Sequence, residues 1–298
     1  MIQTRRYEFL VQNTPQKEWI EKRGILMWLA MFFIELGAGA FVVSSIVGNQ
    51  LGMLLGWLLC GVLGGGFHLV YLGHPTRFWR MVLSSGWKTS WISRGLAFVT
   101  LFLGLGLLHM VLLQWASPVT GLLIAANIFA FLAIIYVGFV MASVNGIPLW
   151  NTALLPVLYL VLGVWGGLGL TILTLEATGA TTIAVGSVEE WSRIFLVAFI
   201  FIVFVYLLTI RYQGATGKTS VRVIVAGKLA PLFWIGVALF GTAFPVGVAI
   251  ATWVAGLSIP TALLFVLIIL ELLGDLTLRY CILKAGLYAP LIPSTSYA

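Results

Sequence analysis

Charged residues are scarce in this chain, and their scarcity excludes a soluble fold. Asp, Glu, Lys and Arg make up 8% of the 298 residues, while 61% are apolar. Soluble domains carry about 25% charged residues, which keep their surfaces hydrated. The net charge of +7 comes from a few cations whose placement is explained below by membrane topology. It therefore implies no nucleic-acid partner.

Cysteine and histidine are equally rare, which limits what the protein can bind by itself. Cys60 and Cys281 stand apart, without the CxxC or Cys/His spacing of a zinc or iron–sulfur site. His68 and His109 lie in neighbouring predicted helices at depths that differ by roughly 13 Å, too far for one haem iron. A lone His109 is more typical of helix packing. The sequence thus predicts neither haem nor metal here, and assigns any iron–sulfur centre to a partner.

What the sequence has instead is a series of long apolar runs. A membrane-spanning helix needs about 20 mainly apolar residues, because lipid offers no partner to exposed backbone groups. We therefore predict an all-α integral membrane protein, a single transmembrane domain over residues 1–298 with about eight helices in a bundle. The predicted helices span residues 25–47, 51–73, 95–115, 119–142, 150–175, 192–212, 229–255 and 258–283.

An even number of spans puts both termini on one face of the membrane. That face, called the basic face below, also holds the two longer loops predicted at 74–94 and 213–228. Of the 16 Lys and Arg residues, all but Arg193 fall on it. Short loops rich in Lys and Arg stay in the cytoplasm. The sequence predicts a multi-pass protein of the cell inner (plasma) membrane, in contact with its lipid and with both termini cytoplasmic.

Four charged side chains lie inside predicted spans and away from the ends of these spans, at depths where a charge costs at least about 2.5 kcal/mol and often marks function. Glu271, Asp275 and Arg279 recur every four residues and share one helix face. Glu35 lies about ten residues, or roughly 15 Å, into the first span, at a depth that matches Glu271. Asp275 and Arg279 could simply neutralise each other, or the ladder could relay protons. Glu35 and Glu271 are candidates for a proton-linked catalytic role.

Aromatic and polar residues gather near the basic face of the second to fifth spans. A quinone site needs an apolar cleft, a few hydrogen-bond donors and a titratable group, because the ring exchanges protons with its electrons. The segment 73–95 is rich in Arg and Trp, which anchoring at the membrane interface alone would also explain. Tyr136 and His68 are the candidate catalytic residues of this region. The candidate quinone-binding residues are Tyr71, Arg77, Trp91, Arg94, Asn145, Trp150 and Asn151.

Five motifs carry a family resemblance. In sequence order they are GHPTRFWR, SWISRG, YVGFVMAS, PLWNTALLP and ELLGDLTLRY, and together they resemble the NrfD/PsrC/DmsC family of membrane anchor subunits. The resemblance implies an eight-helix protein without haem, with one quinol site near the face where a ferredoxin-like subunit with four iron–sulfur clusters docks. It further implies that this subunit connects the anchor to a molybdopterin (bis-MGD) catalytic subunit.

The resemblance also suggests roles for individual residues. By position in these motifs, Tyr136 resembles the family's quinone-contacting tyrosine, and Arg77 and Arg94 resemble its loop arginines. The family's histidine at the start of the first helix is absent from EKRGILMW, and its histidine before the GxP loop is replaced by Tyr71. His68, one turn before Tyr71, is the candidate substitute.

The expected function is electron exchange between menaquinone or ubiquinone and an iron–sulfur partner, within an oxidoreductase complex whose catalytic metal lies on another subunit. Members of the resembled family with a cytoplasmic docking loop include sulfite- and phenylacetyl-CoA-oxidising complexes, so the resemblance favours substrate oxidation with quinone reduction. The alternative is a respiratory reductase anchor that oxidises quinol for polysulfide, DMSO or arsenate. A secondary transporter coupled through Glu35 and Glu271 is less favoured, because GTAFPVG at 241–247 has no counterpart in the first half of the sequence.

Overall fold

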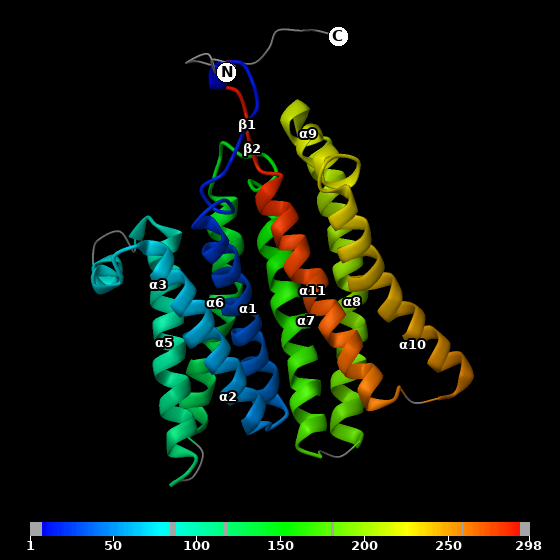
Figure 1. The fold of residues 1–298 in the computed structure, drawn as a ribbon. Coiled ribbons are helices and arrows are strands. Elements are labelled where there is room, and N and C mark those ends of the chain that lie inside the picture. The colour runs from blue at the N-terminus through cyan, green and yellow to red at the C-terminus, as the bar shows by residue number, and fades with distance from the viewer. Residues whose placement is uncertain (1–7, 84–87, 116–118, 180–181, 258, 293–298) are drawn as a thin grey trace.

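Long helices run side by side between two faces of the computed structural model (Figure 1). The structure describes residues 8–83, 88–115, 119–179, 182–257 and 259–292. Within these ranges, eight helices are long and apolar enough to cross a membrane, which confirms the predicted class of a helical multi-pass membrane protein. They are α1 (Gly24–Ile46), the continuous α2 (Gln50–Leu58), η2 (Leu59–Gly65) and α3 (Gly66–Leu72), α5 (Trp91–Leu112), α6 (Thr120–Ala142), α7 (Leu154–Ala177), α8 (Thr182–Arg211), the continuous η5 (Leu232–Ala243) and α10 (Phe244–Ala255), and α11 (Thr261–Lys284).

Short elements gather at the face that carries the terminal segments. They are η1 (Glu8–Leu10), β1 (Thr14–Pro15), η3 (Pro75–Arg77), α4 (Trp79–Leu83), α9 (Gly214–Val225) and β2 (Leu287–Tyr288). Strand β1 pairs antiparallel with β2, and Thr14 lies opposite Tyr288. Lys284 donates to Glu21 at 2.6 Å, and this hydrogen bond lowers the pKa of the Glu21 carboxyl below its usual value. The segments next to the two termini therefore share one face, as predicted.

The prediction of a loop over 213–228 is wrong for most of its length, because α9 occupies Gly214–Val225. The helix is amphipathic: Thr216, Ser220 and Ile224 recur every four residues and are buried against the bundle. The prediction was based on long apolar runs, and the polar residues on one face of α9 interrupt such a run. The third span also begins earlier than predicted, at Trp91, because the Ser90 hydroxyl accepts the Ser93 backbone N–H and caps the helix.

Helices α1 and α7 are the most buried of the eight and form the centre of the bundle. Small residues let their backbones approach closely: a Cβ atom added at Gly39 or Gly167 would overlap the backbone of the other helix. Ser44 and Thr171 are hydrogen-bonded across this interface at 2.9 Å. The contact fixes α1, and with it Glu35, between α7 and the helices that surround them.

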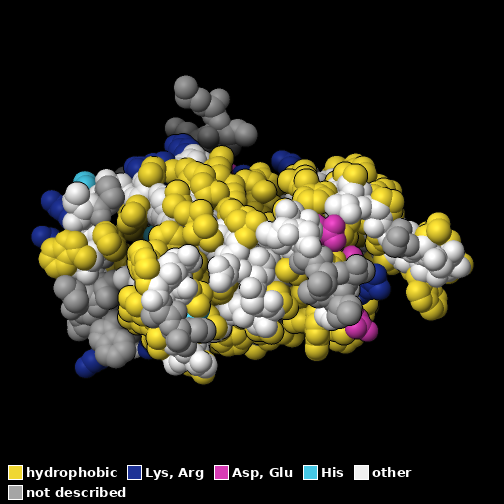
Figure 2. All heavy atoms as spheres, turned by 90° about the horizontal axis from the view of Figure 1, so that it is seen from below, with side chains coloured by type: hydrophobic (Ala, Val, Ile, Leu, Met, Phe, Trp, Pro, Cys, Tyr) yellow, Lys and Arg dark blue, Asp and Glu magenta, His cyan; other side chains and the backbone are white. Residues whose placement is uncertain are grey.

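The face opposite the terminal segments carries little charge. Figure 2 shows mostly hydrophobic side chains (yellow) and white atoms, which are backbone or other side chains, with acidic side chains gathered in one area. Arg193 pairs with Glu189 at 3.3 Å on this end of α8. The assignment of the basic face to the cytoplasm stays a prediction from the Lys and Arg distribution.

Candidate functional site

An apolar cleft of about 260 Å³ opens between the second, third and fourth spans. Its polar side chains are His68 of α3, Tyr136 of α6 and Thr100 of α5. The Thr100 hydroxyl donates to the Leu96 carbonyl within its own helix. Among the described residues, neither the His68 ring nor the Tyr136 hydroxyl has a hydrogen-bond partner. The remaining lining residues are Ile34, Gly61, Gly65, Leu69, Phe78, Ile92, Leu96, Val99 and Leu103.

Two backbone features make room for this cleft. Residues Leu59–Gly65 form a π-helical stretch, and Gly61 and Gly65 of this stretch line the cleft. A π-helical turn is wider than an α-helical one and is frequent at functional sites. On the facing side, a Cβ atom at Gly95 would overlap the Tyr136 ring. The absence of a side chain at Gly95 therefore lets Tyr136 lie across the start of α5.

An aromatic rim borders the cleft on the basic face. Trp91 stacks on Phe139, with ring centroids 4.5 Å apart and an interplanar angle of 11°. The Arg94 guanidinium lies over the Trp91 ring, 4.8 Å from its centroid, and donates to the Lys88 carbonyl. Arg77 is exposed in η3. Trp91, Arg94 and Arg77 thus border the cleft region without lining it, while Phe78, next to Arg77, does line it.

The other predicted quinone ligands have structural roles. Asn151 donates to the Ala142 carbonyl at 2.6 Å and to Asn145 at 3.1 Å, which closes the turn between α6 and α7. The indole N–H of the buried Trp150 donates to the Ile282 carbonyl at 2.9 Å, which ties this turn to α11. Tyr71 lines a separate surface hollow together with the 17–24 segment. The structure does not bring these four residues to the His68–Tyr136 cleft.

Behind the cleft, three ionisable side chains form a buried ion cluster. The Arg279 guanidinium donates to Glu35 at 2.5 Å and to Asp275 at 2.6 and 3.3 Å. All three side chains are at most 3% exposed. The sequence predicts the Asp275–Arg279 pair, which is confirmed, but it does not predict that Glu35 completes the cluster. Arg279 also lies over the Tyr159 ring, 4.8 Å from its centroid.

The opposite directions of α1 and α11 explain why the Glu35 side chain contacts Arg279 and does not contact Glu271. Side chains lean toward the N-terminus of their own helix. Helix α1 starts at the basic face, so Glu35 leans toward that face, whereas α11 starts at the opposite face, so Arg279 leans toward the bilayer centre. The two side chains converge. Glu271 leans away from them, toward the opposite face. Its backbone lies at a depth similar to that of Glu35, but the two side chains therefore point apart.

The ion cluster has one more carboxylate than it has cations. If both carboxylates are ionised, a negative charge remains uncompensated in a dry environment, which is costly. One oxygen of Glu35, Oε1, has no hydrogen-bond partner among the described residues. A proton on Oε1 of Glu35 would neutralise the cluster and leave the hydrogen bond from Arg279 to the other oxygen in place. The cluster can therefore store one proton at Glu35.

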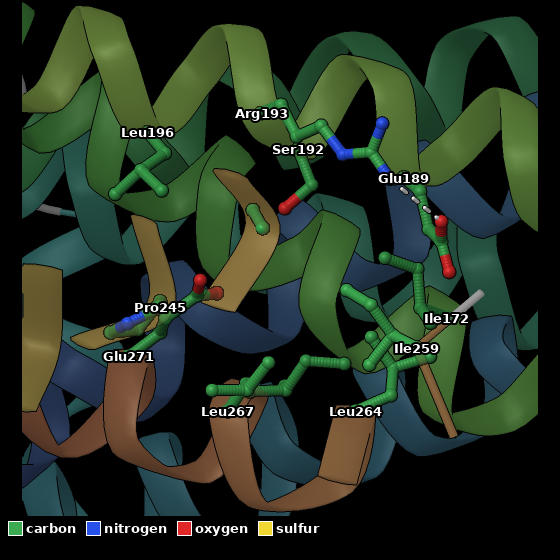
Figure 3. A pocket seen from close by; sticks show the side chains of 12 residues that line it. Ile172, Glu189, Ser192, Arg193, Leu196, Pro245, Ile259, Leu264, Leu267 and Glu271 are labelled. Atoms are coloured by element: carbon green, nitrogen blue, oxygen red, sulfur yellow. Dashed lines mark hydrogen bonds and ion pairs between the residues drawn. The ribbon is translucent and has the colours of Figure 1, made fainter. Parts of the chain in front are cut away.

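Glu271 lines a pocket of about 50 Å³ near the opposite face. Figure 3 shows it on α11, while the Glu189–Arg193 pair and Ser192 line the same pocket from α8. Glu271 is half-buried and has no hydrogen-bond partner among the described residues. Together with Asp275 it also borders a small gap beside Trp165. Glu271 thus lies between the opposite face and the ion cluster.

The comparison with known protein families agrees with this arrangement. Residues 21–290 match the family described as "Polysulphide reductase, NrfD". The protein belongs to this family. It is also 26% identical to the polysulfide reductase C subunit of Wolinella succinogenes over 306 aligned positions, which cover 90% of the present sequence and 96% of that subunit. The NrfD family resemblance predicted from five motifs is confirmed, and neither comparison supports a secondary transporter.

In this NrfD family protein, the motifs mark the surroundings of the cleft and of the ion cluster. GHPTRFWR forms η3 and the start of α4, SWISRG opens α5, and YVGFVMAS carries Tyr136 near the end of α6. Sequence reasoning missed Gly95, although it is the glycine of SWISRG, and it missed the π-helical stretch. A glycine within a functional motif is a signal of close packing that could have identified Gly95.

Proposed function

We propose that this protein exchanges electrons between a membrane quinone and an iron–sulfur partner subunit at the His68–Tyr136 cleft. The observation that supports this function is an apolar cleft in which two hydrogen-bonding side chains have no partner among the described residues, since most polar groups inside proteins are paired. A quinone takes up two electrons and two protons to become a quinol, and its two carbonyl oxygens accept hydrogen bonds. Menaquinone and ubiquinone both fit this chemistry.

Each residue of the cleft has a distinct task in this proposal. The Tyr136 hydroxyl and the His68 ring N–H donate to quinone oxygens and orient the head group. His68 also supplies or accepts a proton, as imidazole does near neutral pH. The aliphatic and aromatic lining excludes water. Glu35 of the ion cluster follows Ile34, which lines the cleft, and serves as the proton store behind it. Glu271 serves as a proton-linked carboxylate closer to the opposite face.

The partner is proposed to dock on the basic face, at η3, α4 and the start of α5. The described part of this surface exposes Arg77, Trp79 and Arg80, a composition typical of protein interfaces. Phe78, between them in sequence, lines the cleft, so a partner bound here lies close to the quinone head group. The relative from Wolinella is named as one subunit of a reductase. By similarity, we propose a ferredoxin-like subunit with four iron–sulfur clusters and a molybdopterin (bis-MGD) catalytic subunit as partners.

The direction of electron flow separates two versions of this function. A cytoplasmic docking face favours substrate oxidation with quinone reduction, of the sulfite or phenylacetyl-CoA type. The name of the Wolinella relative favours quinol oxidation for a reductase, of the polysulfide, DMSO or arsenate type. The purified complex supplied in turn with quinol and with quinone, together with each candidate substrate, tests both. Turnover that requires quinol selects the reductase, and turnover that requires quinone selects substrate oxidation.

A glycine substitution tests the geometry of the cleft. Gly95→Ala should lower quinone-dependent turnover more than tenfold, because the new methyl group pushes the Tyr136 ring out of place. Gly104→Ala in the same helix is the matched control, since its Cβ would enter open space. Steady-state kinetics of the membrane-bound complex measure both. Equal turnover in the two variants would show that the position of the Tyr136 ring is unimportant for turnover.

Reporter fusions test the predicted orientation. Fusions after Gly227 and at the C-terminal Ala298 should give inactive alkaline phosphatase and active β-galactosidase, because Lys and Arg hold this face in the cytoplasm. A phosphatase fusion in the 178–181 segment, on the opposite face, should be active and serves as the control. Active phosphatase at both basic-face positions would show that the docking surface lies outside the cytoplasm.

A further inference from the structure

A second apolar hollow, the α8–α10 groove, lies on the outer surface of the bundle and goes beyond the proposed quinone function. Its volume is about 560 Å³. One wall is α8 from Phe199 to Arg211, and the other is η5 and α10 from Phe233 to Val246. Ile200, Phe204 and Leu208 are exposed along its rim. The groove therefore opens toward the lipid that surrounds the helices.

The packing of η5 explains why this groove is open. Gly241 of η5 faces Gly274 of α11 so closely that a Cβ atom on either would overlap the other backbone. Gly236 packs on the side chain of Thr277, whose methyl carbon would lie 3.0 Å from an added Cβ atom. These contacts hold η5 against α11, and α10 leans outward from the bundle beyond them (Figure 1). The side of η5 and α10 that faces α8 stays uncovered.

The groove has the length of one membrane leaflet. From Phe199 to Arg211, twelve helical steps of 1.5 Å give about 18 Å, and half of the hydrocarbon core measures about 15 Å. A transmembrane helix of a partner needs the full core of about 30 Å. A single acyl chain that descends from the basic face fits this length.

Cations gather at the end of the groove on the basic face. Arg211 lines the groove itself, and α9, which closes this end through Val221 and Val225, exposes Lys218 and Arg222. Lys228 follows in the turn before η5. The sequence has no Asp or Glu between residues 191 and 270, and none of these four cations forms an ion pair with another described residue. This end of the groove therefore attracts anions.

We propose that the α8–α10 groove binds an anionic phospholipid. One acyl chain lies between α8 and η5–α10, and the phosphate contacts Arg211 with Arg222 of α9 nearby. Basic pockets between membrane helices recognise anionic head groups in this way. The indole N–H of Trp234 donates to the Val225 carbonyl at 2.8 Å, which fixes the end of α9 beside the groove. The bound lipid would add contacts between α8 and α10 across the groove.

Native mass spectrometry of the purified full-length protein tests this site. Phosphatidylglycerol should bind about 25-fold more tightly than phosphatidylcholine with the same acyl chains, at about fivefold for each of two cations. Arg211→Gln combined with Arg222→Gln should abolish this preference. Arg80→Gln combined with Lys88→Gln removes two cations from another part of the same face and should leave it intact. Ala238→Phe, which fills the groove with apolar atoms, should reduce binding of both lipids at this site.

A photoactivatable phosphatidylglycerol gives a readout on the unmodified protein. Cross-links should map to residues 199–211 and 233–246, and glycerol 3-phosphate at the same concentration should not compete, because it lacks the acyl chain. Equal binding of the two phospholipids, or an unchanged preference in the Arg211/Arg222 variant, would refute the proposal. Cross-links confined to other helices, or displacement of the lipid by quinone or by a copurified subunit, would also refute it.

Discussion

Arg279→Met should destabilise the protein by about 3–5 kcal/mol, because it leaves Glu35 and Asp275 buried without a cation. The matched control is Arg193→Met. Arg193 also lies four residues after a carboxylate, Glu189, but it is 57% exposed, and an exposed pair contributes at most about 1 kcal/mol. Thermal unfolding of the detergent-solubilised protein, followed by size-exclusion chromatography, compares the two variants.

Neutralising the whole cluster should restore much of the lost stability. In the triple variant Glu35→Gln, Asp275→Asn and Arg279→Met, no charge remains buried, so the main cause of the destabilisation is removed. If Arg279→Met unfolds at the same temperature as Arg193→Met, the two carboxylates need no cation, and the cluster has no structural role. If the triple variant is as unstable as Arg279→Met, packing around the guanidinium and not its charge explains the loss.

Tyr136→Phe and His68→Ala should each lower quinone-dependent kcat/KM by about 100-fold or more, with the complex still assembled. A positioned proton donor or acceptor contributes about 10² to 10⁴ in rate, and both side chains line the cleft without another partner among the described residues. His74→Ala and Tyr212→Phe are the controls, because both side chains are exposed and lie outside the cleft. Electron transfer from an artificial dye to the catalytic partner should be unchanged in all four variants.

The two substitutions should also be less than additive when combined. If Tyr136 and His68 hold the same quinone, the second substitution removes an interaction from a head group that is already misplaced. Normal quinol kinetics in both single variants would exclude this cleft as the quinone site. A loss in the His74 control equal to that in His68→Ala would point to a general requirement for histidine near the basic face.

The sequence predicts eight helical spans because lipid leaves the backbone no alternative to a helix. The predicted start of the sixth span at 192 is wrong, since α8 begins ten residues earlier, at Thr182. It also predicts that His68 and Tyr136 lie close to the basic face, and the structure places both in one cleft. It assigns Trp150 and Asn151 less well, because their hydrogen-bond partners are set by tertiary contacts such as that with Ile282, 132 residues away. A side-chain donor that could bind a ligand is often hydrogen-bonded instead to a backbone carbonyl that is distant in sequence but near in space.

The ion cluster illustrates a second limit of sequence analysis. Asp275 and Arg279 are four residues apart in one helix, so their pairing follows from helical periodicity. The contact of Arg279 with Glu35 depends on which helices are neighbours and on the lean of each side chain. The π-helical stretch at Leu59–Gly65 is similarly hidden, because one inserted residue hardly changes an apolar pattern. Neither the Glu35–Arg279 contact nor the π-helical stretch can be recognised from the residues next to it in the sequence.

The separation of Glu35 and Arg279 in the sequence has a consequence for biogenesis. Glu35 lies in α1, which is synthesised before the other described membrane-spanning helices, and its cation follows 244 residues later, in α11. At about 5–20 residues per second, synthesis takes roughly 12–50 s to reach Arg279. During that time the inserted polypeptide holds an uncompensated carboxylate, which favours retention by the insertion machinery over release into lipid. A nascent polypeptide truncated before α11 would lack Arg279, so Glu35 would stay without the cation that it contacts in the folded protein.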